Sequence, residues 1–121
     1  MPIRSNSPDF TVKSHFENRD ANVREIYDRL LRGSKKFGRV IEEPKKTSIH
    51  LVRKTAFAAV ATRKTALILT LKLDAGPKSA RIRKREQTSA HRWHVEVMLE
   101  SPAQVDQELK GWLERAYELS A

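Results

Sequence analysis

Apolar residues recur at helical spacing in two segments, one near each end of the chain. In the first, Val23, Ile26 and Leu30 lie three or four positions apart with charged residues between them, which predicts an amphipathic helix over residues 21–36. Asp20 stands where a helix N-cap is expected, and Gly38 is a stop signal just beyond the last turn. The second apolar stripe comprises Val105, Leu109, Trp112, Leu113, Ala116 and Tyr117.

A helix start signal precedes the second stripe. Ser101 and Gln104 have the spacing of a capping box, in which each side chain bonds the backbone N–H of the other residue. Pro102 takes the first helical position, where its missing N–H has no cost. The sequence therefore predicts a C-terminal helix that begins directly after Ser101.

Between the two helices the apolar pattern changes to a period of two, which is typical of antiparallel strands. The predicted strands span residues 39–43, 47–53, 56–62, 66–73, 80–85 and 93–99. We expect an α+β fold of two layers, an antiparallel sheet of about five or six strands with an N-terminal and a C-terminal helix on one face. Residues 1–13 are rich in Pro, Ser and Asn and are expected to form a flexible N-terminal arm, which leaves residues 14–121 as a single α+β domain.

Alternation assigns the side chains of each strand to one of two faces. The sets that begin at Leu67 and Trp93 are apolar at every second position, so they are expected to face the helices. Parity also points Ile49, Leu51 and Ile82 toward the core. The residues then expected on the outer face are His50, Val52, Ile68, Thr70, Lys72, Arg81, Arg83, Arg85, His94, Glu96 and Met98.

Composition and charge narrow the function classes. The chain has 121 residues, a formal net charge of +9 and no cysteine, which excludes disulfides, thiolate nucleophiles and cysteine-based zinc sites. The positive charge is concentrated in residues 41–92, whereas residues 93–121 are acidic. No apolar run approaches the length of a membrane span, so we expect a cytoplasmic protein without a membrane partner. A basic domain of this kind attracts polyanions.

The histidines give little indication of metal or catalytic chemistry. His91 and His94 form an H-x-x-H pair, but on a strand that odd spacing sends the two imidazoles to opposite faces. The sequence also contains no phosphate-binding glycine loop and no nucleophile motif. We therefore predict no metal site, no cofactor and no catalytic residue.

The outer face offers a surface for binding. Arg81, Arg83 and Arg85, if they share one side of a strand, can contact successive phosphates of a nucleic acid. The predicted binding residues are Arg81, Arg83, Arg85, Arg92, His50, His94 and Lys72. The first hypothesis is a non-enzymatic binding module that uses a basic open sheet face, with weak, sequence-independent binding of nucleic acid or another polyanion.

Two alternatives stay open from the residues alone. One is a small-ligand-binding protein or enzyme whose site gathers His50, His94 and Glu96. The other is an interaction or regulatory subunit that meets a protein partner, or a second copy of itself, through the sheet. Ile68, Val52 and Met98 favour contact of some kind, because a purely solvated face seldom collects apolar residues.

Several segments together resemble a known family. They are KTSIHLVRKTAFAAVATRK (46–64), LTLKLD (69–74), REQTSAHRWHVEVMLESPAQVD (85–106) and LKGWLERAYELS (109–120). From about Ser14 to Ser120 the chain resembles a bacterial domain-of-unknown-function family of small stand-alone or C-terminal domains, some of whose members are labelled predicted transport proteins. The resemblance implies a single conserved domain and assigns no activity and no functional residue.

Overall fold

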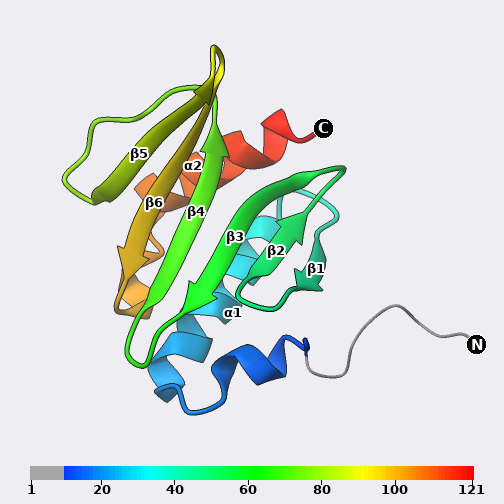
Figure 1. Ribbon diagram of the computed structural model, residues 1–121, viewed down its shortest axis with the longest axis vertical. Coiled ribbons are helices and arrows are strands. Elements are labelled where there is room, and N and C mark those ends of the chain that lie inside the picture. The colour runs from blue at the N-terminus through cyan, green and yellow to red at the C-terminus, as the bar shows by residue number, and fades with distance from the viewer. Residues whose placement is uncertain (1–9) are drawn as a thin grey trace, which may run out of the picture.

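Helix α1 (Ala21–Lys35) forms where the apolar spacing predicts it, in a computed structural model that describes residues 10–121 (Figure 1). Val23, Ile26 and Leu30 are fully buried, which confirms the predicted core-facing stripe. Asp20 occupies the N-cap position, but its side chain makes no cap hydrogen bond. Instead its backbone N–H donates to the carbonyl of Lys64 at 2.9 Å, so the helix start is tied to the turn after the third strand.

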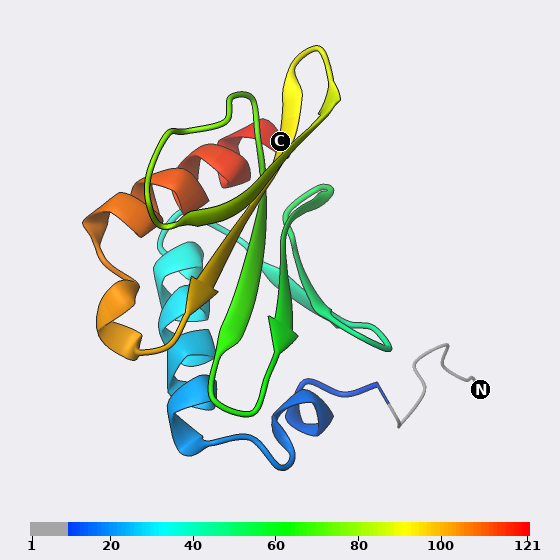
Figure 2. The same ribbon diagram turned by 60° about the vertical axis from the view of Figure 1, so that its left-hand side comes forward.

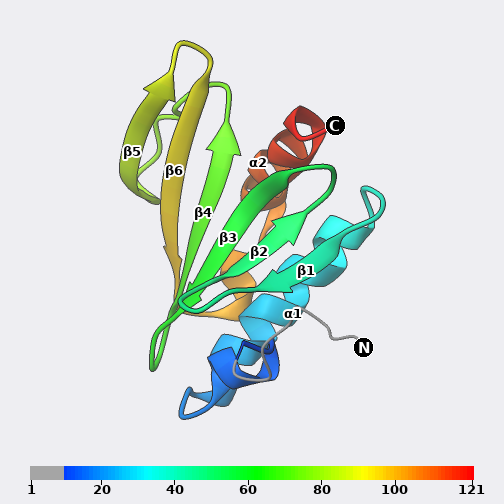
Figure 3. The ribbon, with the colours of Figure 1, turned by 45° about the vertical axis from the view of Figure 1, so that its right-hand side comes forward.

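The sheet has six antiparallel strands in the order β1-β2-β3-β4-β6-β5. Their bounds are β1 (Ile41–Pro44), β2 (Ile49–Val52), β3 (Ala56–Thr62), β4 (Leu67–Leu73), β5 (Ile82–Ser89) and β6 (Arg92–Leu99). Figure 3 shows this order from β5 at one edge to β1 at the other, with the helices behind. β5 runs four residues beyond its predicted end. The loop after β4 carries the chain to the outer edge, and β6 then returns beside β4.

Both α-helices cover one face of the sheet, so the expected α+β architecture is confirmed (Figure 2). Leu67, Leu69 and Leu71 are fully buried against the helices, and Val95 and Leu99 on β6 are buried with them. Tyr27 and Phe57 are the largest fully buried side chains of the core. Within residues 10–121, no α-helix covers the opposite face of the sheet, as the two-layer prediction requires (Figure 2).

The C-terminal helix begins later than predicted. The capping box of Ser101 and Gln104 is present, but it starts only the 3-10 turn η2 (Pro102–Gln104). Val105 then leaves the helical region (φ −83°, ψ 71°) and places its side chain in the core at 5% exposure. Helix α2 (Gln107–Leu119) begins after this turn, with Asp106 as its N-cap. The Asp106 side chain accepts a hydrogen bond from the N–H of Leu109 at 3.1 Å.

The structure describes the chain from residue 10 onward, so most of the predicted N-terminal arm, residues 1–13, lies outside the described residues. A 3-10 turn, η1 (Lys13–Phe16), packs beside the end of β3. The Thr62 hydroxyl donates to the His15 carbonyl at 2.6 Å, and the His15 ring bonds the Lys45 carbonyl at 2.8 Å. These bonds join η1 to both the β1–β2 turn and β3.

Candidate functional site

The open face of the sheet is built from rows of residues that lie in register across the strands. One row runs from His50 on β2 through Ala59 on β3 and Thr70 on β4 to Glu96 on β6 and Lys84 on β5. The two central members are small, so the middle of this face lies low between longer side chains. The open face therefore presents charged groups on both sides of a shallow centre.

A second row brings Lys72 on β4 beside His94 on β6 and Glu86 on β5. Alternation along β6 also points Arg92 to the open face, and its side chain and that of Lys72 line a small cavity of about 50 Å³ at the end of the sheet, which the C-terminal end of α2 lines as well. Its guanidinium donates to the adjacent His91 carbonyl at 2.8 Å. The structure thus places Lys72, His94 and Arg92 together on the open face, as parity predicts.

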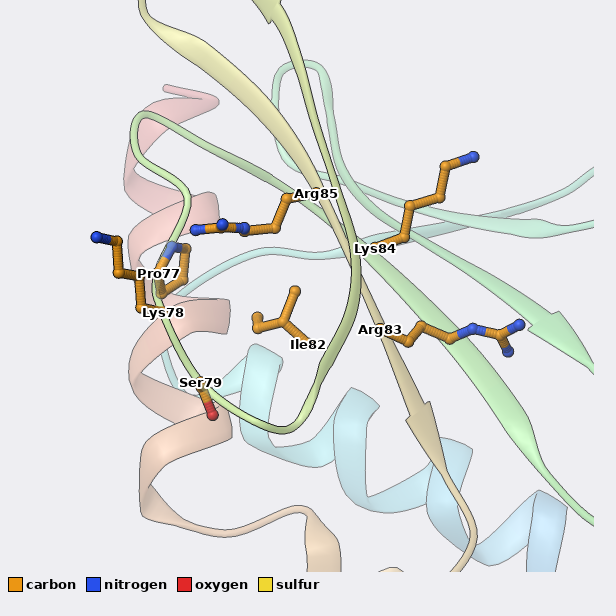
Figure 4. Close-up of a pocket in the computed structure, with 7 residues that line it drawn as sticks. All are labelled: Pro77, Lys78, Ser79, Ile82, Arg83, Lys84 and Arg85. Atoms are coloured by element: carbon orange, nitrogen blue, oxygen red, sulfur yellow. The ribbon is translucent and has the colours of Figure 1, made fainter.

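Arg81, Arg83 and Arg85 do not share a face, and this expectation from the sequence was wrong. The register jumps from Ile82 opposite Val97 to Lys84 opposite Glu96, so a β-bulge inserts Arg83 as an extra residue. Beyond a bulge the alternation is inverted. Figure 4 shows Arg83 and Lys84 on one side of β5 and Ile82 and Arg85 on the other.

Arg81 is a structural residue at the start of α2. Its guanidinium donates to the Gln104 carbonyl at 2.5 Å and to the carboxylates of Asp106 at 2.8 Å and Glu108 at 3.3 Å. Its side chain is only 23% exposed, and the hydrogen bond from Arg81 is the main cause that lowers the pKa of Asp106. Arg81 therefore holds β5 against α2 on the helix side and lies away from the open face.

Arg85 also lies on the helix side, opposite Val95. Its guanidinium donates to the Gly76 carbonyl at 3.1 Å in the loop between β4 and β5. That loop and β5 line an open cavity of about 300 Å³, whose lining includes Pro77 and Ile82 (Figure 4). Arg85 therefore supports the loop over the edge strand.

Arg83 lies on the open face as predicted, and Lys84 lies there in place of Arg81 and Arg85. Arg83 pairs with Glu96 at 3.4 Å on the open face, and Lys84 stands beside it, exposed. Lys84 was missed because β-strand parity put it on the helix side. The sequence gives no indication of the bulge, because the bulged segment contains no glycine or proline.

The pKa of His50 is lowered by burial and by nearby charges. Burial is the main cause that lowers the pKa of His50, and the positive charges of Lys45 and Lys72 lower it further. Glu43, which lies opposite His50 on β1, acts in the other direction and is outweighed. The potential at this end of the open face is therefore positive.

His50, His94 and Glu96 are not gathered into one site. His50 lies three strands away from Glu96 in the same row, which at the usual strand spacing is about 14 Å. His94 and Glu96 are two residues apart on β6 and share a face, but Glu96 is paired with Arg83. The geometry gives the proposed histidine–glutamate site no common centre. Among residues 10–121, no group of three or more His, Asp or Glu side chains is placed to hold a metal ion.

The family comparison matches almost the whole chain. The family described as domain of unknown function (DUF5655) covers residues 12–120. The chain belongs to this family. Searches of the curated proteins and of the solved structures gave no match.

The DUF5655 match extends from just before η1 to the end of α2, so it contains both layers and the open face. It confirms the resemblance to a family of unknown function, while the bacterial origin and the transport label stay predictions. No helix in residues 10–121 is long and apolar enough to cross a membrane.

Proposed function

We propose that this DUF5655 domain is a non-enzymatic binding module that holds a nucleic acid by its phosphate backbone against the open sheet face. The observation that carries the proposal is the set of exposed cations there: Lys72, Lys84 and Arg92, with Arg83 beside them. Within the described residues, neither Lys72 nor Lys84 forms an ion pair. Lysines without partners lose no internal interaction when they meet a phosphate.

The lowered pKa of His50 supports an anionic partner. Burial is the main cause of the lowered pKa, and the charges of Lys45 and Lys72 lower it further and outweigh Glu43. A phosphate placed there would offset the repulsion among these cations, and it would favour the protonated form of His50. Binding at this face should therefore strengthen as the pH falls toward the ordinary pKa of histidine.

We expect the open face to contact the phosphate backbone of the nucleic acid. Trp93 and Trp112 are half-buried against the core and offer no stacking platform on the open face. The face has a low centre at Ala59 and Thr70, flanked by cations, which suits a sequence-independent phosphate track. If four cations contact phosphates of duplex DNA, the logarithm of the binding constant should fall with the logarithm of the salt concentration with a slope of about −3.6.

The test is fluorescence anisotropy with labelled duplex and single-stranded DNA and RNA at low salt. In the open-face variant, Lys72, Arg83 and Lys84 are each replaced by Ser, which should reduce the magnitude of the salt slope by about 2.7. In the matched control, Lys54, Arg63 and Lys64, which lie in the turns at the ends of β3, are replaced by Ser in the same way. The control and the open-face variant therefore have the same net charge. The proposal fails if the wild type binds none of these nucleic acids, or if both variants lose affinity equally.

A further inference from the structure

A second cationic surface lies on the helix side, opposite the open face. The groove between α1 and α2, whose crossing is visible in Figure 2, contains two adjoining cavities of about 250 and 440 Å³. Gly33, Lys36 and Lys110 line both of them. We call this surface the interhelical groove.

Four cations converge on the interhelical groove. Arg29 and Arg32 on α1 and Lys36 at its C-cap are spaced three and four residues apart, which puts them on one side of that helix. Lys110 reaches in from the first turn of α2. All the residues that line the smaller cavity are cationic or apolar, apart from Gly33, so like charges meet there without a lining carboxylate.

Most of these cations lack a partner within the described residues. Arg32, Lys36 and Lys110 form no side-chain hydrogen bond or ion pair there. Arg29 has two long contacts, one to the Glu25 carboxylate at 3.8 Å and one to the Pro102 carbonyl at 3.4 Å. The cost of holding these like charges together is relieved when an anion enters.

Two glycines line the groove. Gly33 is buried at the crossing, and a Cβ placed on it would lie 3.8 Å from the Lys110 side chain. A Cβ placed on Gly111 would meet nothing within 4 Å, so the larger cavity has empty space above this helix turn. Gln107 lines the same cavity at the start of α2, where the helix dipole favours negative charge.

The groove fits a short anion better than a long one. From Arg29 to Lys36 the three cations span eight residues, a rise of about 10 Å, which corresponds to about three phosphate-to-phosphate spacings in one DNA strand. Carboxylates border the groove on both helices: Glu25 one turn before Arg29 on α1, and Glu114 one turn after Lys110 on α2, where it lines the larger cavity. A polynucleotide continuing past either end would be repelled.

We propose that the interhelical groove binds a small polyphosphate-bearing ligand through Arg29, Arg32, Lys36 and Lys110. The guanidinium groups of Arg29 and Arg32 bind phosphate oxygens in pairs, and the two lysines act as point charges. The adjoining cavity, which Phe37 and Gly111 line, receives the uncharged part of the ligand where there is one. This site is separate from the open face and goes beyond the function proposed for it.

The test is isothermal titration calorimetry with inorganic phosphate, pyrophosphate, inorganic triphosphate and a nucleoside triphosphate in a buffer free of divalent cations. We expect affinity to rise with the number of phosphates. In the groove variant, Arg32→Ser with Lys36→Ser, the Kd for triphosphate should rise at least about tenfold. Lys110→Ser should weaken binding as well, and Lys36→Arg should retain it.

The matched control is Lys54→Ser with Lys64→Ser, which removes the same charge from turns away from the groove. Equal losses in the control and the groove variant, or no triphosphate binding by the wild type, would overturn the proposal. It would also be overturned if the groove variant lost oligonucleotide binding while keeping triphosphate binding. The open-face variant should keep full triphosphate affinity, so the two proposals can fail independently.

Discussion

Replacing Arg81 by Met tests whether this arginine holds the fold together. Met retains an apolar stem of similar length and removes the guanidinium. The bond from Arg81 to the Gln104 carbonyl is a charged hydrogen bond, which contributes about 1.5 kcal/mol. The ion pairs with Asp106 and Glu108, both about half exposed, add up to about 1 kcal/mol together. We expect Arg81→Met to lower the free energy of unfolding by about 2 kcal/mol.

The assay is urea unfolding followed by circular dichroism. With a urea dependence of about 2 kcal/mol per molar, a loss of about 2 kcal/mol lowers the midpoint by about 1 M. The control is Arg115→Met, which breaks the pair of Arg115 with Asp74 on a half-exposed surface and should lower the free energy of unfolding by clearly less than Arg81→Met does. If Arg81→Met is no more destabilising than Arg115→Met, the assignment of Arg81 to a structural role is refuted.

A double-mutant cycle separates the ion pair from the helix cap. Asp106→Asn keeps an N-cap side chain, because Asn caps about as well as Asp, but it removes the charge that faces Arg81. We expect a coupling of about 0.5 kcal/mol between Arg81→Met and Asp106→Asn. The lowered pKa of Asp106 stabilises the fold above its ordinary pKa and stops doing so as the pH falls through the lower folded value. The difference between wild type and Arg81→Met should therefore shrink below about pH 4.

Two further predictions concern glycines and a histidine. Gly38 has φ +151°, and a Cβ there would collide with the Tyr117 hydroxyl, so Gly38→Ala should destabilise by more than about 1 kcal/mol in thermal unfolding. Gly111→Ala, in an open helical position, should stabilise by about 0.5–1 kcal/mol, and the reverse order of the two effects would contradict the packing described here. NMR titration should find the pKa of His50 below its ordinary value and raised by Lys72→Ser, with stability lost as the pH falls below about 6.5; an unchanged His50 pKa in that variant would contradict the electrostatic account.

The layers of the fold can be predicted from apolar periodicity, because the apolar side chains on one face of a strand or helix are buried together. Leu67 and Leu71 stand at alternate positions of β4, and both are fully buried beneath the helices as predicted. The start of α2 was harder to predict, since the capping box at Ser101 is genuine but belongs to a separate turn. Whether a capped turn continues as a helix depends on the following residue, and here Val105 turns into the core instead.

The candidate site was predicted only in part, because a bulge reverses parity without a sequence signal. Lys72 and His94 lie on strands without an irregularity at their positions, and both are on the expected face. On β5, the single extra residue Arg83 moves Lys84 to the open face and Arg85 to the helix side. An argument from alternation holds only up to the first irregularity in a strand.

Charge along the chain does not indicate which cations are available to a ligand. The basic segment 41–92 includes Arg81, but its charge is paired with the acidic start of α2, in the segment 93–121. In contrast, Arg32 and Lys36 lie in a less basic segment, and the crossing with α2 brings Lys110 to them across 74 residues of chain. The fold pairs some cations and gathers others, so a binding surface is set by where helices cross and strands bulge. For this domain that reasoning favours two separate anion sites on opposite faces over one continuous basic surface.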